Sequence, residues 1–164
     1  MVEIVFQEAA VFRITDQVVV NRPVAEVFAF VADRENLPLW SSAMQESHRI
    51  TDGSGASPDG VGAVYRMAGR MMGRRLEGRY ERTAYENGQL LGGRAAAGPM
   101  SMTETYHFEA VGPQAAATRV SMATEIVPAG LLGLLGPLMA AGLRRQIAAS
   151  HAKLKQVLET PRTS

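Results

Sequence analysis

A long stretch near the end of the chain, residues 128–159, constrains the fold most. Its first part, PAGLLGLLGPLMAAGL, carries no charge, and its second part, RRQIAASHAKLKQVLE, mixes charged and apolar residues at helical spacing. One side of the predicted helix collects apolar and small residues: Leu132, Gly136, Met139, Leu143, Ile147, Ser150, Leu154, Val157 and Leu158. A helix with one apolar stripe needs an apolar surface to lie on, so we expect the preceding residues to form a sheet that covers it.

The rest of the chain reads mostly as strands. Residues 10–21 are rich in β-branched side chains and predict a first strand. Pro23 then opens a short helix that ends near Asp33, and a further helical turn closes at Trp40. Extended runs separated by turn residues predict six more strands, at 44–51, 61–71, 74–85, 89–97, 100–111 and 118–127. Hairpin spacing makes this sheet antiparallel, so the prediction is an α+β fold in which about seven strands (β-α-α-β6-α) curve around a long C-terminal helix.

Alternation along the strands separates an apolar face from a polar one, with one exception. In the run 100–111, Glu104 falls on the same side as Met102, Tyr106 and Phe108. A buried carboxylate needs a partner, and Arg94, one strand earlier, is the candidate. Two interpretations stay open: a structural position, at a strand end or paired with Arg94, and a polar group that orients an apolar guest in a cavity.

Size and composition predict one globular domain over residues 1–164, with a core at about 10–159 and frayed ends at 1–8 and 160–164. The net charge of +1 argues against nucleic acid as a partner. Six arginines do gather in one hairpin, at 66, 70, 74, 75, 79 and 82, but Glu77 and Glu81 interrupt them. A solvated hairpin is the favoured interpretation, and an anion-attracting mouth stays open as an alternative.

The sequence carries no basic N-terminal leader, so we expect a cytoplasmic protein. The uncharged stretch 126–143 contains Pro128, Pro137 and several glycines, which argues against stable membrane insertion and leaves transient membrane contact open. The chain has no cysteine, and His48, His107 and His151 are not spaced as metal ligands. We therefore expect no metal and no cofactor, and we expect His107 and His151 at the surface.

Two stretches carry a family resemblance: VVVNRPVAEVFAFVADRENLPLW at Val18 to Trp40 and TRVSMATEIVP at Thr118 to Pro128. With the hydrophobic helix that follows, they resemble the entry and the final strand of the START-like, or SRPBCC, superfamily. Within it, the chain is most similar to the polyketide cyclase/dehydrase-like group of small bacterial proteins. The resemblance implies a helix-grip fold with a cavity between the sheet and the long helix, usually for a lipid-like, aromatic or polyketide molecule.

We therefore predict a hydrophobic ligand-binding carrier or sensor, acting as a monomer or homodimer. Its predicted cavity residues are Trp40, Met67, Met102, Tyr106, Met122, Leu138, Met139 and Leu143. The methionines among them favour loose selectivity, because the Met side chain is flexible and polarizable. The first alternative is a cofactor-independent cyclase or dehydratase that uses Glu104, Arg94 and Tyr106, with Tyr65 or Tyr80 as further candidates. The second is a protein-interaction or stress-linked module.

We expect the glycine-rich first part of the C-terminal stretch to have a different structure and role from the rest of it. Gly130, Gly133, Gly136 and Pro137 make residues 128–138 a poor continuous helix, so Pro137 should begin or kink the main helix. Three interpretations of 128–138 stay open: a cavity lid, a docking patch, or a buried capping turn.

Overall fold

The computed structural model describes residues 11–161 apart from residues 72 and 130–135. The elements, in chain order, are β1 (Phe12–Val20), α1 (Val24–Ala32), η1 (Arg34–Asn36), α2 (Leu37–Trp40), β2 (Met44–Thr51), β3 (Val64–Met71), β4 (Arg74–Glu86), β5 (Leu90–Ala97), β6 (Met100–Val111), η2 (Pro113–Ala115), β7 (Ala117–Pro128) and α3 (Gly136–Glu159). This order is the one the sequence predicts, and the α+β fold class is confirmed.

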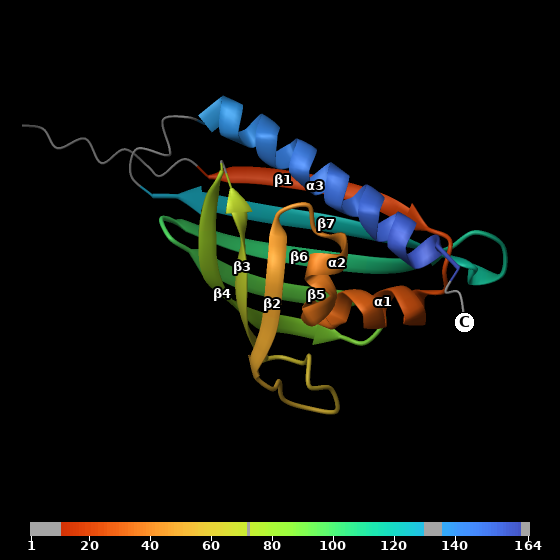
Figure 1. Cartoon of the computed structure of the whole chain (residues 1–164). Helices are drawn as coiled ribbons and strands as arrows, with labels where there is room; N and C mark the ends of the chain where they lie inside the picture. Colours follow the sequence, from red (N-terminus) through yellow and green to blue (C-terminus); the bar gives the residue numbers. More distant parts are fainter. Residues whose placement is uncertain (1–10, 72, 130–135, 162–164) are drawn as a thin grey trace, which may run out of the picture.

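The seven strands form one antiparallel sheet in the order β1-β7-β6-β5-β4-β3-β2. The first strand closes the sheet against the last, with Phe12 opposite Ile126 and Val20 opposite Thr118. The sheet curves, and α1, α2 and α3 all lie on its concave side (Figure 1). The predicted helix-grip architecture is therefore present.

The apolar stripe of α3 faces the sheet as expected. Leu154 and Leu158 are buried, and Gly136, Ala140 and Ser150 lie on the same side of the helix and are also buried. Helix α3 begins at Gly136, and Pro137 sits in its first turn, where a missing backbone N–H costs nothing. The prediction that Pro137 marks the start of the main helix is confirmed.

Hydrogen bonds attach the C-terminal end of α3 to the start of the chain. The Arg22 Nε donates to the Leu158 carbonyl at 2.9 Å, and Lys155 Nζ donates to the Val19 carbonyl at 2.7 Å. The Asn21 backbone N–H donates to Glu159 Oε1 at 2.7 Å. The first of these bonds satisfies a carbonyl that the last turn of a helix leaves without a partner, and all three together fix this end of α3 against the end of β1.

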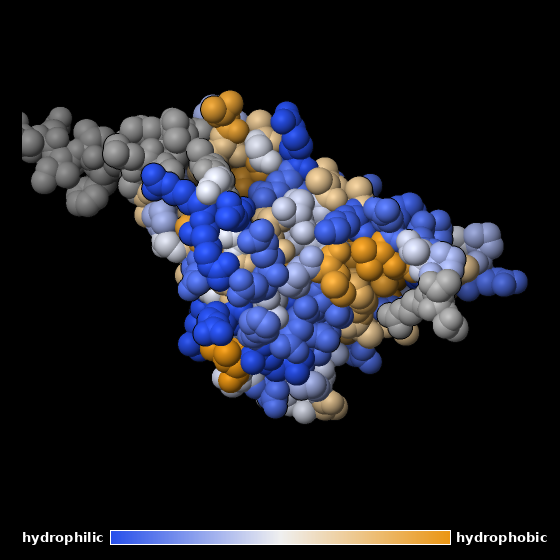
Figure 2. Space-filling view, in the orientation of Figure 1, coloured by the Kyte–Doolittle hydropathy of each residue, from blue (hydrophilic) through white to orange (hydrophobic). Residues whose placement is uncertain are grey.

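The arginine-rich hairpin is solvated on its outer face, with one exception. Arg66, Arg70, Arg74, Arg75 and Arg79 are exposed, and hydrophilic side chains cover most of the surface over β2, β3 and β4 (Figure 2). Arg82 differs from them, because it is only 1% exposed. The interpretation of Arg82 as a surface residue was wrong, since its position in β4 shares the inward side with Tyr80.

Strand β3 starts three positions later than the sequence indicates, at Val64 rather than at Val61. A tight turn occupies the intervening residues: the Ala63 N–H donates to the Gly60 carbonyl at 3.0 Å. Gly62 has φ of +90°, a conformation that favours glycine. Residues 61–63, whose apolar character predicts a strand, therefore belong to this turn instead.

We expect Leu154→Ala to lower the free energy of unfolding by about 2–5 kcal/mol, because it leaves a cavity in the core beneath α3. Leu154 has no exposed surface, whereas Leu138, on the same helix, is 80% exposed. Leu138→Ala is the matched control and should change the free energy by less than about 0.5 kcal/mol. Urea denaturation followed by circular dichroism measures both; equal losses would contradict the orientation of α3.

Candidate ligand-binding site

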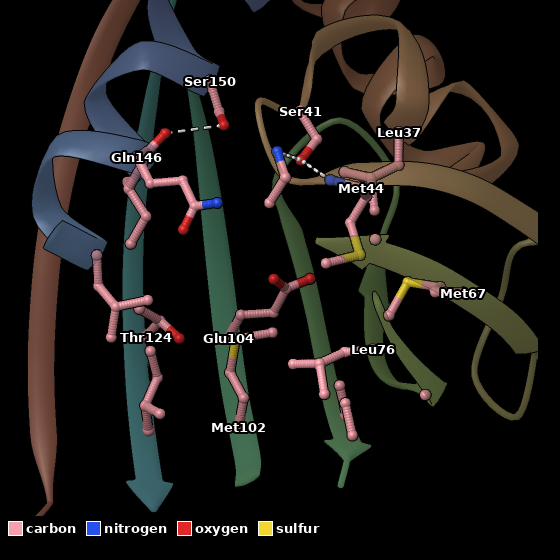
Figure 3. A pocket seen from close by; sticks show the side chains of 18 of the residues that line it. Leu37, Ser41, Met44, Met67, Leu76, Met102, Glu104, Thr124, Gln146 and Ser150 are labelled. Atoms are coloured by element: carbon pink, nitrogen blue, oxygen red, sulfur yellow. Dashed lines mark hydrogen bonds between the residues drawn. The ribbon is translucent and has the colours of Figure 1, made fainter. Parts of the chain in front are cut away.

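A cavity of about 200 Å³ lies between the concave face of the sheet, α2 and the middle of α3. Its walls are mostly apolar and come from the inward-facing positions of β3 to β7 (Figure 3). The apolar lining includes Leu37, Trp40, Met44, Met67, Leu76, Ala95, Met102, Tyr106, Met122, Ile126, Leu143 and Ile147. Apolar walls with a few polar groups are typical of small-molecule sites.

Six of the predicted cavity residues line this space: Trp40, Met67, Met102, Tyr106, Met122 and Leu143. Leu138 and Met139 do not, so the structure corrects these two. Leu138 comes five residues before Leu143, which turns it about 140° around the helix, and it is 80% exposed. Met139 is half-buried on the stripe, one turn before the part of α3 that borders the cavity. The proposed lid falls largely on residues 130–135, outside the described residues.

Polar contacts close the cavity between α2 and α3. The Ser42 backbone N–H donates to Ser150 Oγ at 3.0 Å, and Ser42 Oγ donates to the Gln146 carbonyl at 3.0 Å. Ser41 Oγ accepts the backbone N–H of Met44 at 2.9 Å, which shapes the turn into β2. These hydrogen bonds hold the segment after α2 against α3, and this segment forms the cavity wall on that side.

The lining includes a buried ion pair, and the exposed Arg70 is a further charged residue at its border. The Arg34 Nη1 lies 2.5 Å from Glu104 Oε1, and the two side chains are 5% and 6% exposed. The carboxylate of Glu104 points into the space between Met44 and Gln146 (Figure 3). Glu104 therefore does face the interior, as the alternation predicts.

The predicted partner of Glu104 was wrong. Glu104 stands opposite Gly93 in the register of β5 and β6, and Arg94 stands opposite Thr103. Because successive side chains point to opposite faces of a sheet, Arg94 lies on the outer face. There it is exposed and pairs with Glu81, with Arg94 Nη2 2.8 Å from Glu81 Oε2. Arg94 is accordingly excluded from the cavity.

The short turn that follows α1 places Arg34 beside Glu104. Asp33 accepts the Glu35 backbone N–H at 3.0 Å, which starts the short turn η1 and sends the next side chain inward. The Arg34 guanidinium carbon lies 3.6 Å from the ring centroid of Tyr80. Stacking on an aromatic face compensates part of the loss of hydration of a buried cation.

Gly93 makes room for Tyr80 under Arg34. A side chain at Gly93 would place its Cβ 2.0 Å from the Tyr80 hydroxyl oxygen, so only glycine fits there. Arg82 also contacts the Tyr80 hydroxyl: Arg82 Nη1 donates to Tyr80 Oη at 2.9 Å, and Arg82 Nη2 donates to the Ala32 carbonyl at 2.9 Å. The second buried arginine thus fixes Tyr80 and the end of α1 together.

The charges set the protonation of the neighbouring groups. Burial alone would lower the pKa of Arg34, but the negative charge of Glu104, with smaller contributions from Tyr80 and Tyr106, raises it above its ordinary value. Burial raises the pKa of Tyr80 to about 12 and the pKa of Tyr106 well above its ordinary value. At neutral pH the cavity lining therefore carries a permanent cation and the neutral phenol of Tyr106, and the phenol of Tyr80 against Arg34 is neutral as well.

A second polar pair, between the buried His151 and the half-buried Asp16, joins α3 to β1. His151 is 2% exposed, and its Nδ1 lies 2.6 Å from Asp16 Oδ2. His151 lines the cavity, and its ring meets the Tyr106 ring edge-on with centroids 6.4 Å apart. The expectation that His151 is a surface residue was wrong, because it lies next to Ser150 on the buried side of α3; His107 is exposed, as predicted.

Sequence reasoning missed Arg34, Asp16 and His151. The one available signal was Glu104 itself, an acidic residue on an apolar face that requires a cation. Its partner lies 70 positions away in a turn, where no periodicity distinguishes an inward from an outward side chain. Asp16 and His151 are 135 positions apart and meet only because β1 and α3 pack together.

Within the parts of the chain that the structure describes, no group of three or more His, Cys, Asp or Glu residues is arranged to hold a metal ion. Among the same residues, no helix combines the length and the apolar character needed to cross a membrane.

The family model described as polyketide cyclase/dehydrase and lipid transport matches residues 11–159, so the chain belongs to this family. Among solved structures, the fold is similar to a START superfamily protein from Mycobacterium smegmatis, with a TM-score of 0.77 and 11% identity over 90% of this chain and 97% of that one. It is also similar to the Zhui aromatase/cyclase from Streptomyces sp. R1128, with a TM-score of 0.73 and 16% identity over 92% of this chain and 94% of that one. No curated protein matches in sequence. At these identities the likeness establishes the fold alone.

We expect Glu104→Gln to lower the free energy of unfolding by about 3–5 kcal/mol, because it leaves the buried Arg34 charge without a counter-charge. The double variant Arg34→Met, Glu104→Leu should recover most of this loss, since it removes both charges and keeps apolar volume. Urea denaturation curves give both values.

Glu81→Gln is the matched control for that experiment. It breaks the exposed pair with Arg94 and should cost less than about 1 kcal/mol. A Glu104→Gln variant as stable as the Glu81→Gln variant would show that the Arg34–Glu104 pair is not buried as described.

Proposed function

We propose that this chain binds a small hydrophobic molecule in the cavity between the sheet and α3, and that one polar group of the molecule contacts Glu104. The observation that carries the proposal is an apolar cavity of about 200 Å³ whose lining includes the buried Arg34–Glu104 pair. A carboxylate held by an arginine accepts further hydrogen bonds, so a hydroxyl group on the ligand fits it. The family description and the fold support the general assignment.

The size of the cavity narrows the class of ligand. An engineered apolar cavity of about 150 Å³ holds benzene, and drug-sized ligands occupy about 300–1,000 Å³. A cavity of about 200 Å³ lies between the two, which favours a molecule of one or two rings with short substituents. A full-length lipid chain requires a larger space than the one described.

The wall composition favours a ligand class rather than one exact shape. Met44, Met67, Met102 and Met122 all border the cavity. Their side chains change rotamer readily and contact aromatic rings favourably, so the walls adapt to related guests. Carriage or sensing of a group of small aromatic or alicyclic molecules is therefore our first assignment.

A cofactor-independent cyclase or dehydratase is the second candidate function. The Asp16–His151 pair favours it, because a buried histidine at a cavity wall is a usual general base. Glu104 and Tyr106 remain candidate catalytic residues for this activity. Arg94 is no longer a candidate, because its side chain lies on the outer face.

Trp40 provides a direct test of binding, because it is the single tryptophan of the chain and it lines the cavity. We expect its fluorescence to change saturably on titration with 2-tetralol, a two-ring alcohol, and to change little with palmitate. Tetralin, which lacks the hydroxyl, should bind about tenfold more weakly, since one hydrogen bond to a charged group contributes about 1.5 kcal/mol or more.

Ala95→Phe should weaken 2-tetralol binding at least about tenfold, because Ala95 lines the cavity and a phenyl ring there fills it. Ala123→Phe is the matched control: Ala123 is exposed on the outer face of β7 and should bind like the wild type. Tighter binding of palmitate than of 2-tetralol, or equal losses in both variants, would overturn the proposal.

A further inference from the structure

The Asp16–His151 pair has the geometry of an oriented base. Asp16 Oδ2 lies 2.6 Å from His151 Nδ1, and a carboxylate accepts hydrogen bonds without donating them. The hydrogen bond therefore places the ring proton on Nδ1 and leaves the lone pair on Nε2. The same arrangement orients the histidine of hydrolytic triads.

The Nε2 atom has no hydrogen-bond partner among the described residues, although it is fully buried. Leaving a buried polar atom unpaired costs about 1–3 kcal/mol. A histidine that served only to hold α3 against β1 would need Nδ1 alone. A purely structural role therefore does not explain the unpaired Nε2. The residue that bears it lines the cavity, next to the ring of Tyr106.

Two hydrogen-bond donors of the same cavity are also buried and unpaired within the described part of the chain. They are the indole N–H of Trp40 and the Nε–H of Arg34, and both residues line the cavity. A permanent cation and an N–H donor stabilise negative charge that develops on an oxygen atom. The cavity lining thus contains a histidine with an unpaired ring nitrogen and two residues with unpaired N–H donors.

We propose that His151, oriented by Asp16, is a general base that removes a proton from a carbon next to a carbonyl group in a small cyclic ketone. The C–H bond breaks, its electron pair forms a carbon–carbon double bond, and the carbonyl π electrons move to the oxygen. Arg34 and Trp40 stabilise this enolate oxygen. The proton on Nε2 then returns to carbon or oxygen, or exchanges with solvent so that a solvent proton returns in its place, and the enolisation balances without any other co-reactant.

This inference rests on the proposed function, since the ketone must first occupy the cavity. It goes beyond binding because it assigns a catalytic residue, a positioning residue and a substrate class. Asp16 acts through His151 and does not itself touch the substrate in this account.

The test uses 2-tetralone in heavy water. Its α-protons exchange with solvent through the enolate, and proton NMR follows the exchange, while Trp40 fluorescence measures binding of the same compound. We expect the wild type to exchange bound 2-tetralone faster than buffer does. His151→Gln and Asp16→Asn should each lose about a hundredfold or more of this rate while binding stays within about twofold.

Asp16→Asn separates a positioning role from a structural one. The amide that Asp16→Asn introduces can donate a hydrogen bond to His151 Nδ1, which favours the tautomer with the proton on Nε2. In that tautomer Nε2 has no free lone pair to take a proton from the substrate. Nitrogen-15 NMR of His151 should show the Nδ1–H tautomer in the wild type and its loss in Asp16→Asn. His107→Gln, which alters an exposed histidine, is the matched control and should exchange at the wild-type rate.

The outcomes separate the two proposals. Binding without accelerated exchange in the wild type, or unchanged exchange in folded His151→Gln, overturns the base while binding stands. Absence of 2-tetralone binding overturns both. Should His151→Gln fail to fold, Asp16→Asn decides: a wild-type exchange rate in that variant contradicts the orienting role of Asp16 and with it the proposal.

Discussion

The buried ion pair between Arg34 and Glu104 is the interaction on which the cavity depends. It joins the turn after α1 to the centre of the sheet, and both side chains are almost completely buried. Removing two charges from water is expensive, and hydrophobic side chains of similar volume often stabilise such a position equally well. The pair is therefore costly as a device for stability alone, and its place in the lining of an apolar cavity is the basis of our proposal that it presents a charged acceptor to a guest.

The supporting residues around this pair form a continuous structure. Tyr80 lies against Arg34, Gly93 leaves space for Tyr80, and Arg82 fixes the Tyr80 hydroxyl and the end of α1. Each of these residues fixes or makes room for the next one, and none of them is required to form the outer surface of the protein. A ligand site requires this kind of support, because a polar group orients a guest only when its own position is fixed.

The fold was predictable from the sequence because its signals are local. Strand alternation, turn residues and the stripe of α3 each act over a few positions, and the predicted bounds of β2 and β6 agree with the structure. The inward orientation of Glu104 follows from the same alternation. The partner of Glu104 does not, because Arg34 reaches it from a turn without periodicity. Leu138 shows a different limit: hydrophobic character indicated burial, but its angle on the helix turns it to solvent. His151 shows the reverse, since a polar residue on the flank of the stripe is buried by its contact with β1.

The most direct test of the account is a crystal structure of the protein with 2-tetralol bound. We predict electron density for the two rings among Met67, Met102 and Met122, with the hydroxyl oxygen about 2.5–3.0 Å from a carboxylate oxygen of Glu104. Density at any place other than the cavity, or a guest whose hydroxyl points away from Glu104, would contradict the claim that the buried pair orients the ligand.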